Sequence, residues 1–297
     1  MAKTVLNTSV SEQSLQSIQA SKKASKRLDR IVSYILLVFM SILFLLPFIW
    51  LIGTSLKPEA EAISYPPSLI PKEVDWKNYA EVFELVPFLK FYQNTIIVTL
   101  TSVVGTVFSS ALVGYGFARI NGKGRNFWFM MLLATMMLPS QVTMIPVYLI
   151  FAKLGWINTF LPLIVPSFFG SAYFIFLLRQ FFRTIPKELD EAAIIDGCGP
   201  FRIFWNIMLP LVVPSLLTVA ILSFMGSWND FFGPLIYLND TSKFTLSLGI
   251  QTFKGQNTML WGPMMAASTM VITPLVVLFF FAQKYFVQGI ATSGLKG

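Results

Sequence analysis

The chain has 297 residues, of which 55% are hydrophobic and only 12% are charged, and its mean hydropathy of +0.68 is too high for a soluble globular domain. It contains no histidine and a single cysteine, Cys198, which excludes histidine-based catalysis, histidine or cysteine metal clusters and internal disulfides. The net charge of +8 does not by itself indicate nucleic acid, because in a membrane chain the placement of the charges matters more than their sum. We therefore expect no metal site and no nucleic-acid partner.

The first 30 residues are polar and end in a cationic run, Lys22, Lys23, Lys26, Arg27 and Arg30. Their Ser, Gln and Lys content is typical of a mobile segment. The apolar run that follows, from Ile31 to Ile52, is longer than the apolar region of a signal peptide, and no small-residue cleavage site closes it. We therefore predict a tail over 1–30 and a retained first membrane span over 31–53.

Apolar runs of around 20 residues recur along the chain, each long enough to cross a hydrocarbon core of roughly 30 Å as a helix. They predict an all-α polytopic membrane protein. The six predicted spans are 31–53, 91–117, 126–150, 160–181, 211–236 and 263–284. Two segments between spans, 54–90 and about 237–262, are long enough to hold an external partner.

Proline and glycine are frequent inside the spans. Pro139 and Pro146 fall in the third span, and Pro214 and Gly226 in the fifth. Because backbone groups freed in lipid must find new partners, these residues predict kinked helices packed within a bundle.

The second span carries small residues four apart, Gly105 with Ser109 and Ser110 with Gly114. Such pairs allow helices to approach closely. We expect them to serve packing within the chain; a dedicated dimer face is the alternative.

The basic residues predict the orientation of the spans. Fifteen of the 22 Lys and Arg residues fall on the side of the two termini, and seven fall on the opposite side. Since Lys and Arg are enriched in cytoplasmic loops, we predict that both termini are cytoplasmic and that segment 54–90 is extracytoplasmic. The protein is then a multi-pass protein of a cytoplasmic membrane.

Four acids interrupt the apolar sequence between the fourth and fifth spans: Glu188, Asp190, Glu191 and Asp196. The orientation puts them in the cytoplasm. Pro186 is suited to the first position of a short helix, and Gly197 to its end. The acids near the N-terminal end would then be stabilised by the helix dipole.

The helical period places Leu189, Ala192 and Ala193 on one face and Glu188, Glu191 and Ile195 on another. The two alanines would let another surface come close. A second helix is predicted from Pro200 to a break at Pro210. Three interpretations of the acids remain open on this basis: a catalytic carboxylate pair, which has no accompanying nucleophile, a solvated helix face, and a docking element.

The order of residues in this segment carries a resemblance. Glu191-Ala192-Ala193, three residues, Gly197, nine residues and then Ile207-x-Leu209-Pro210 resembles the EAA loop of ABC importer permeases at every fixed position. Asp196 fits the common Asp-Gly form, whereas Cys198 stands where alanine is more usual. Other segments are similar to the sugar-importing branch related to the maltose permease: YQNT at 92–95, SWNDFFGPL at 227–235, TLSLGIQTFKGQ at 245–256 and KYFVQGIATSGLKG at 284–297.

The resemblance implies a type I ABC importer permease fold, with a core over 91–284, an EAA coupling loop over 183–209 and a cytoplasmic tail over 285–297. It also implies partners: a second, homologous permease, two ATP-binding subunits that hold ATP and Mg²⁺, and an extracytoplasmic solute-binding protein that delivers a sugar or oligosaccharide. This chain would bind no cofactor, in agreement with its lack of a phosphate-binding G-x-x-x-x-G-K-[ST] motif. It would not be an enzyme.

Site residues follow by the same resemblance. Coupling to the ATPase would involve Glu191, Ala192, Ala193, Asp196, Gly197, Ile207, Leu209 and Pro210. The segment 246–256 would reach the binding protein through Gly249, Gln251 and Phe253, and the tail Gly294 to Gly297 would contact the ATPase pair.

Polar residues in or near the spans are the candidates for the substrate path: Asn94, Thr99, Gln141, Tyr148, Ser167, Ser171, Tyr173, Asn229 and Asp230. Hydroxyls that satisfy the helix backbone are the alternative for each. An ion-coupled carrier, a membrane enzyme and a permease for a non-sugar solute are the competing functions. The carrier is disfavoured because Asp230 is the only acid found in a predicted span.

Overall fold

The computed structural model describes residues 2–254 and 259–294, with side chains over 27–254 and 259–283, and the fold in this part of the chain is helical. This confirms the predicted all-α class. The elements in chain order are α1 (Ala2–Ser55), α2 (Glu59–Ala62), α3 (Lys77–Leu85), α4 (Phe88–Arg119), α5 (Arg125–Thr135), α6 (Ser140–Lys153), α7 (Leu161–Ile164), η1 (Val165–Phe169), α8 (Ala172–Thr184), α9 (Glu188–Ile195), α10 (Pro200–Ile203), η2 (Phe204–Met208), α11 (Leu209–Leu211), α12 (Val213–Trp228), α13 (Phe232–Tyr237), η3 (Thr241–Lys243), α14 (Leu246–Gly249), η4 (Ile250–Phe253) and α15 (Trp261–Gly294).

Four helical segments within the described residues are long and apolar enough to cross a membrane: Arg27–Ser55, Phe88–Arg119, Leu161–Thr184 and Trp261–Gln283. Two bent pairs bring the number to six if each pair is one span. These are Arg125–Thr135 with Ser140–Lys153, and Pro200–Leu211 with Val213–Trp228.

The bent pairs turn more sharply than single kinked helices over 126–150 and 211–236 would. The first pair turns by 96°, and Pro139, in extended backbone before α6, stands at the break. A proline lacks the N–H that would continue the hydrogen-bonded ladder, so it ends α5 rather than kinking it. The second pair turns by 80° at Val212, and α12 then ends at Trp228 instead of running to 236.

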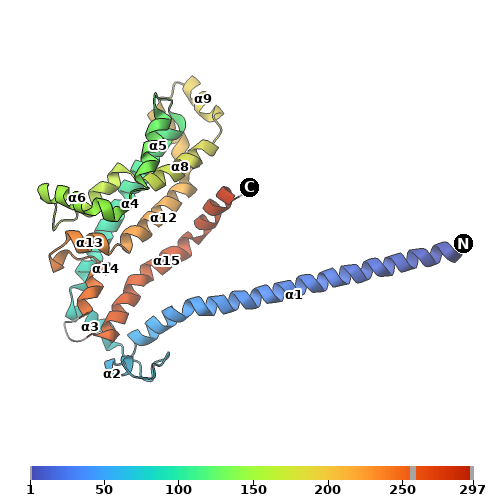
Figure 1. Ribbon diagram of the computed structural model, residues 1–297, viewed down its shortest axis with the longest axis horizontal. Helices are drawn as coiled ribbons and strands as arrows, with labels where there is room; N and C mark the ends of the chain where they lie inside the picture. The colour runs from blue at the N-terminus through green and yellow to red at the C-terminus, as the bar shows by residue number, and fades with distance from the viewer. Residues whose placement is uncertain (1, 255–258, 295–297) are drawn as a thin grey trace.

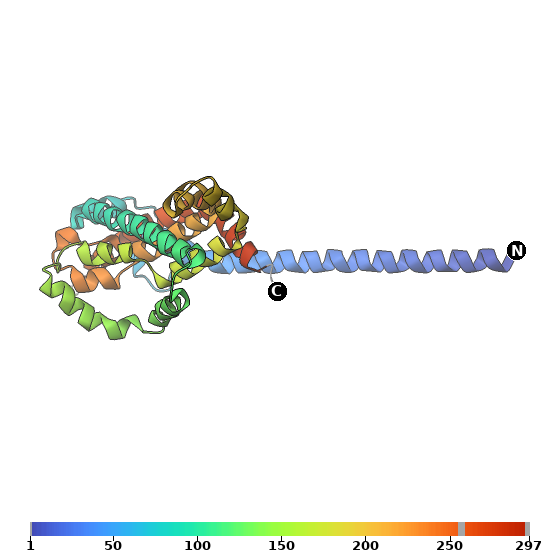
Figure 2. The same ribbon diagram turned by 90° about the horizontal axis from the view of Figure 1, so that it is seen from above.

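Helix α1 extends away from the rest of the molecule and contacts α15 near its own C-terminal end (Figures 1 and 2). It begins at Ala2 and therefore includes the residues of the predicted N-terminal tail. The predicted span 31–53 lies inside it. No residue in the most apolar stretch of α1 is buried within the chain.

Helix α4 is the central element and packs against α8, α12 and η1. A side chain at Gly105 would begin 2.6 Å from the Ser167 hydroxyl, and one at Gly114 would crowd the backbone of α8. Between these glycines, the Ser109 hydroxyl donates a hydrogen bond to the carbonyl of Ser167 at 3.0 Å. The small residues of the second span therefore serve packing within the chain, as expected.

The buried apolar residues form two clusters that α4 connects. The first cluster lies beside α3 and α14 and contains Val82, Phe88, Phe91, Trp228, Leu246, Phe253, Met264, Ala266, Ala267 and Val271. The second lies beneath α9 and contains Ala111, Tyr115, Leu178, Phe182, Ala193, Ile203, Phe204, Met208, Val212 and Val219. The acidic segment is thus built onto a core of its own.

Candidate functional site

The acidic segment forms α9, which stands at one end of the bundle (Figure 1). The helix begins at Glu188, two residues later than the Pro186 start that was predicted. It ends in a left-handed residue at the predicted position, Gly197, whose φ is 77°. The amides of Gly197 and Cys198 donate to the carbonyls of Ile194 and Ala193 at 3.0 and 2.9 Å, which is the Schellman arrangement.

The two alanines of α9 face different surroundings. Ala193 is 5% exposed and belongs to the second core cluster, whereas Ala192 and Glu191 are exposed. Ile195 is 86% exposed. The prediction that both alanines lie on one accessible face is therefore wrong for Ala193, which packs α9 against its own chain. The exposed residues of α9 include Glu191, Ala192, Ile194 and Ile195.

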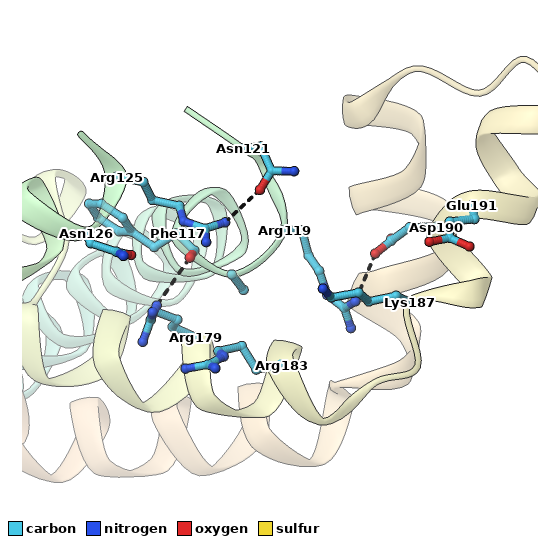
Figure 3. Close-up of a pocket in the computed structure, with 11 residues that line it drawn as sticks. Phe117, Arg119, Asn121, Arg125, Asn126, Arg179, Arg183, Lys187, Asp190 and Glu191 are labelled. Carbon is cyan, nitrogen blue, oxygen red and sulfur yellow. Dashed lines mark hydrogen bonds and ion pairs between the residues drawn. The ribbon is translucent and has the colours of Figure 1, made fainter. Parts of the chain in front are cut away.

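Arg119 at the end of α4 fixes α9 to the bundle. Its guanidinium lies 3.0 Å from the Asp190 carboxylate, and the side chains are 5% and 17% exposed (Figure 3). It also donates to the carbonyl of Phe182 at 3.0 Å and to that of Ile185, beyond the end of α8. A cation at a helix C-terminus interacts favourably with the last carbonyls and the dipole, so Arg119 stabilises α8 as well.

Burial raises the pKa of the Asp190 carboxyl above its ordinary value, and Arg119 only partly offsets this effect. One carboxylate oxygen of Asp190 is buried and has no hydrogen-bond partner among the described residues. The pair is therefore a positional link rather than a large source of stability, because desolvation of a buried ion pair consumes most of the attraction.

The chain after Gly197 packs back under α9. The Tyr115 hydroxyl donates to the carbonyl of Pro200 at 3.2 Å, and the Tyr115 ring lies 5.1 Å from that of Phe204. The second helix predicted from Pro200 is present, but it contains the π-helical turn η2 and continues past Pro210 to Leu211. Ile207 and Leu209 are half-buried against the second core cluster, whereas Pro210 and Asp196 are exposed.

A cavity of about 600 Å³ lies between the ends of α4, α5 and α8 and the start of α9 (Figure 3). Its lining includes five cationic side chains and the two carboxylates of Asp190 and Glu191; the cations are Arg119, Arg125, Arg179, Arg183 and Lys187. These basic residues contributed only to the orientation prediction, because a charge count gives no information about which of them converge.

Several candidates for the substrate path serve the packing of the chain. Asn94 is 2% exposed and its amide donates to the carbonyls of Ser242 and Phe244, both at 2.9 Å. Thr99 is fully buried beside Ser227. The Ser167 hydroxyl donates to the Ile164 carbonyl, and the Ser171 amide donates to Ser110 at 3.4 Å.

The other candidates are more accessible. Gln141, Tyr173 and Asn229 are exposed and do not converge on one another in any hydrogen bond. Tyr148 and Asp230 lie near one shared residue, Tyr237. The Tyr148 and Tyr237 rings stack with centroids 6.2 Å apart, and burial, together with the negative charge of Asp230, raises the pKa of the Tyr237 hydroxyl.

The three residues assigned to binding-protein contact divide in the same way. Gly249 is buried against the ring of Phe91, and Phe253 belongs to the first core cluster, so only Gln251 is exposed. The predicted contact of Gly294 to Gly297 with the ATPase, and the end of the segment 246–256, involve residues outside the described part of the chain.

Residues 110–292 match the family described as binding-protein-dependent transport system inner membrane component. The chain is 34% identical over 278 residues to the arabinooligosaccharides transport system permease protein AraQ of Halalkalibacterium halodurans, a match that covers 92% of this chain and 99% of that one.

Two solved structures have a similar fold. One is a bacterial ABC transporter involved in the import of the acidic polysaccharide alginate, with a TM-score of 0.78 and 26% identity, covering 88% of this chain and 98% of that one. The other is a bacterial alginate ABC transporter in complex with an alginate pentasaccharide-bound periplasmic protein; at 17% identity and a TM-score of 0.63, over 88% and 94% of the chains, it shows the fold alone. Both likenesses extend over most of the chain.

Proposed function

Because the chain belongs to the family of binding-protein-dependent transport system inner membrane components, we propose that α9 couples it to cytoplasmic ATP-binding subunits that drive sugar import. As a member of this family it is an ABC transporter permease, a multi-pass membrane protein and not an enzyme. ATP and Mg²⁺ would be bound by the partner subunits, and this chain would bind no cofactor.

The coupling proposal is carried by one observation, the two-sided character of α9. Its inner side is fixed by Ala193 in the core and by the Asp190 contact to Arg119. Its outer side presents Glu191, Ala192 and two apolar side chains, Ile194 and Ile195, which are 61% and 86% exposed. A rigidly mounted helix with an exposed mixed surface can transmit movement of a docked partner to α4 and α8. Of the residues predicted to couple the chain to the ATPase, Ile207 and Leu209 would then support α9 from below rather than touch the ATPase.

The other partners are proposed from related proteins and from charge. The alginate transporter solved with a sugar-loaded periplasmic protein supports a solute-binding protein, for which Gln251 is an accessible contact. A second permease would cover part of α1, in whose most apolar stretch no residue is buried within the described chain. The excess of Lys and Arg on the side of the termini supports cytoplasmic termini.

The substrate would be a sugar or oligosaccharide, as the relatives' names indicate for their own systems. In this chain the stacked rings of Tyr148 and Tyr237, beside Asp230, are the best-placed pair for a sugar, since aromatic faces offer rigid amphipathic contact area. Gln141, Tyr173 and Asn229 stay as accessible candidates, while Asn94 and Ser171 would act by holding the helices in place.

The test of coupling is the variant Glu191→Lys, reconstituted with its partner subunits and a sugar-loaded binding protein. We expect the stimulated ATPase rate to fall at least roughly tenfold, because reversing a buried interface charge costs several kcal/mol. The matched control is Asp29→Lys, which reverses an exposed carboxylate on α1. A normal stimulated rate in Glu191→Lys, with the protein inserted in the membrane, would overturn the role of α9.

A further inference from the structure

The cavity between α4, α5, α8 and α9 carries more positive charge than its own acids can neutralise. Asp190 is paired with Arg119, which leaves Glu191 to face Arg125, Arg179, Arg183 and Lys187. Clustered like charges repel one another unless a counter-charge is bound. The lining residues therefore favour an anion inside this cavity.

Arg179 is held in a fixed orientation. Its Nε donates to the carbonyl of Phe117 at 3.2 Å, and its guanidinium lies 3.9 Å from the centroid of the Phe129 ring. Both contacts leave the terminal amino groups without a hydrogen-bond partner among the described residues. A planar guanidinium fixed in this way is suited to bidentate contact with phosphate oxygens.

The remaining cations complete the site from the opposite sides. Within the part of the chain that the structure describes, the charged ends of Arg183 and Lys187 make no hydrogen bond or ion pair. Arg125 reaches the cavity from the first turn of α5, with one amino group bonded to Ile120 and Asn121. Figure 3 shows Arg125 and Asn126 on one side of the cavity and Arg179 and Arg183 on the other.

An apolar surface begins directly beside these cations. Phe127 and Trp128, which follow the lining residue Asn126 on α5, are 62% and 61% exposed, and Met130 is 65% exposed. The cavity also lies at the ends of two candidate membrane spans, Phe88–Arg119 and Leu161–Thr184. Basic pockets between membrane helices at this depth bind anionic lipid head groups, and aromatic rings are favoured at the same level.

We propose that this cavity binds the phosphate head group of an anionic membrane lipid, whose acyl chains lie along the exposed face of α5. Arg179 would orient the phosphate, and Arg183, Lys187 and Arg125 would supply the remaining charge. Because the same cavity includes Lys187, Asp190 and Glu191, the lipid would fix the position of α9 relative to α4 and α8. A free phosphate ion offers the same charge but cannot use the apolar surface.

The experiment measures lipid retained by the full-length chain, purified with its partner subunits and exchanged into nanodiscs of phosphatidylcholine with a small fraction of phosphatidylglycerol. Native mass spectrometry then counts phosphatidylglycerol per complex. We expect Arg183→Gln to lower the retained lipid roughly tenfold, because one charge-assisted hydrogen bond contributes about 1.4 kcal/mol or more. Arg183→Lys should restore most of it.

The matched control is Lys123→Gln, which removes an exposed cation of the nearby loop that does not line the cavity. Equal phosphatidylglycerol in Arg183→Gln and Lys123→Gln would overturn the proposal. The proposal would also be overturned if inorganic phosphate displaced the lipid at a concentration equal to that of the lipid. That result would assign the site to a soluble anion. Loss of the ATP-binding subunits from Arg183→Gln at unchanged lipid content would assign the cations to the subunit interface instead.

Discussion

The Arg119 side chain joins three parts of the molecule: the end of α4, the carbonyls beyond α8 and the Asp190 carboxylate of α9. Among the described residues, it is the side chain that donates to the carbonyls of Phe182 and Ile185. The carboxylate is less dependent on it, since burial already favours the neutral form of Asp190. The two partners of this ion pair should therefore differ in their effect on stability.

We predict that Arg119→Met lowers the free energy of unfolding by about 2–4 kcal/mol, because it leaves buried carbonyls and a buried acid without their donor. Asp190→Asn should cost less, about 1 kcal/mol. Hydrogen exchange of the α9 amides in the purified protein measures the effect of each substitution, because both substitutions weaken the attachment of α9 to α4. Equal acceleration of exchange in the two variants would show that the carbonyl contacts contribute nothing.

The residues of α9 were predictable from the sequence, but which of them face the core and which face outward was not. The alternation of acids and alanines placed Ala192 and Ala193 on one face, yet adjacent residues on a helix are 100° apart, and the boundary between faces depends on how the helix is set against the core. Arg119 was counted as one basic residue among many because a contact across 71 positions leaves no local pattern. The left-handed end at Gly197 was predictable, since it depends on backbone conformation alone.

At the level of elements, two glycines of α4 lie in different surroundings: Gly105 is in close contact with another element, and Gly116 is not. Gly105 lies against Ser167 and the Phe168 ring, whereas an added methyl group at Gly116, on the same helix, would meet no atom within 4 Å. Substituting alanine for Gly105 therefore tests the packing of α4, and the same substitution at Gly116 tests helix propensity alone.

We predict that Gly105→Ala destabilises the protein by about 1–3 kcal/mol, because α4 and η1 must move apart. Gly116→Ala should stabilise it by about 0.5–1 kcal/mol, since alanine loses less backbone entropy in a helix. Thermal unfolding of the two variants in the same detergent gives the comparison. A stabilised Gly105→Ala variant would contradict the close contact of α4 with η1.

The membrane-length elements were predictable from hydropathy because each apolar run exceeds the length needed to span a bilayer. Their bends were not. Hydropathy averages over a window and is insensitive to direction, so the 96° turn at Pro139 and the 80° turn at Val212 are invisible to it. Proline marked the place of both turns, since Pro139 lies at the first and Pro210 and Pro214 flank Val212 at the second, but it does not set the size of either turn.

Across the whole molecule, long-range polar contacts close the end that carries α2, α3 and α14. Glu59 accepts hydrogen bonds from the amides of Trp261 and Gly262, both at 3.1 Å, at the start of α15. Asn94 joins α4 to the segment around Ser242. These contacts and the Arg119 link at the α9 end hold the two core clusters at opposite ends of α4.

We predict that the two ends lie on opposite sides of the membrane. Because Cys198 is the only cysteine, Cys198→Ala gives a background in which single cysteines report their side. In spheroplasts, a membrane-impermeant maleimide should label Gln251→Cys and spare Lys123→Cys until the membrane is opened; both positions are exposed. Labelling of Lys123→Cys in closed spheroplasts would reverse the proposed orientation.

The split between the inner and outer sides of α9 has an evolutionary consequence. Ala193 and Asp190 are constrained by neighbours within the same gene product, whereas Ala192 and Ile195 are exposed. Substitutions at the first pair should therefore be compensated within this gene, for example at Arg119, and those at the second set in the gene for the docked ATPase. The eight residues of α9 should therefore show two separate sets of correlated substitutions, one within this gene and one with the gene for the ATPase.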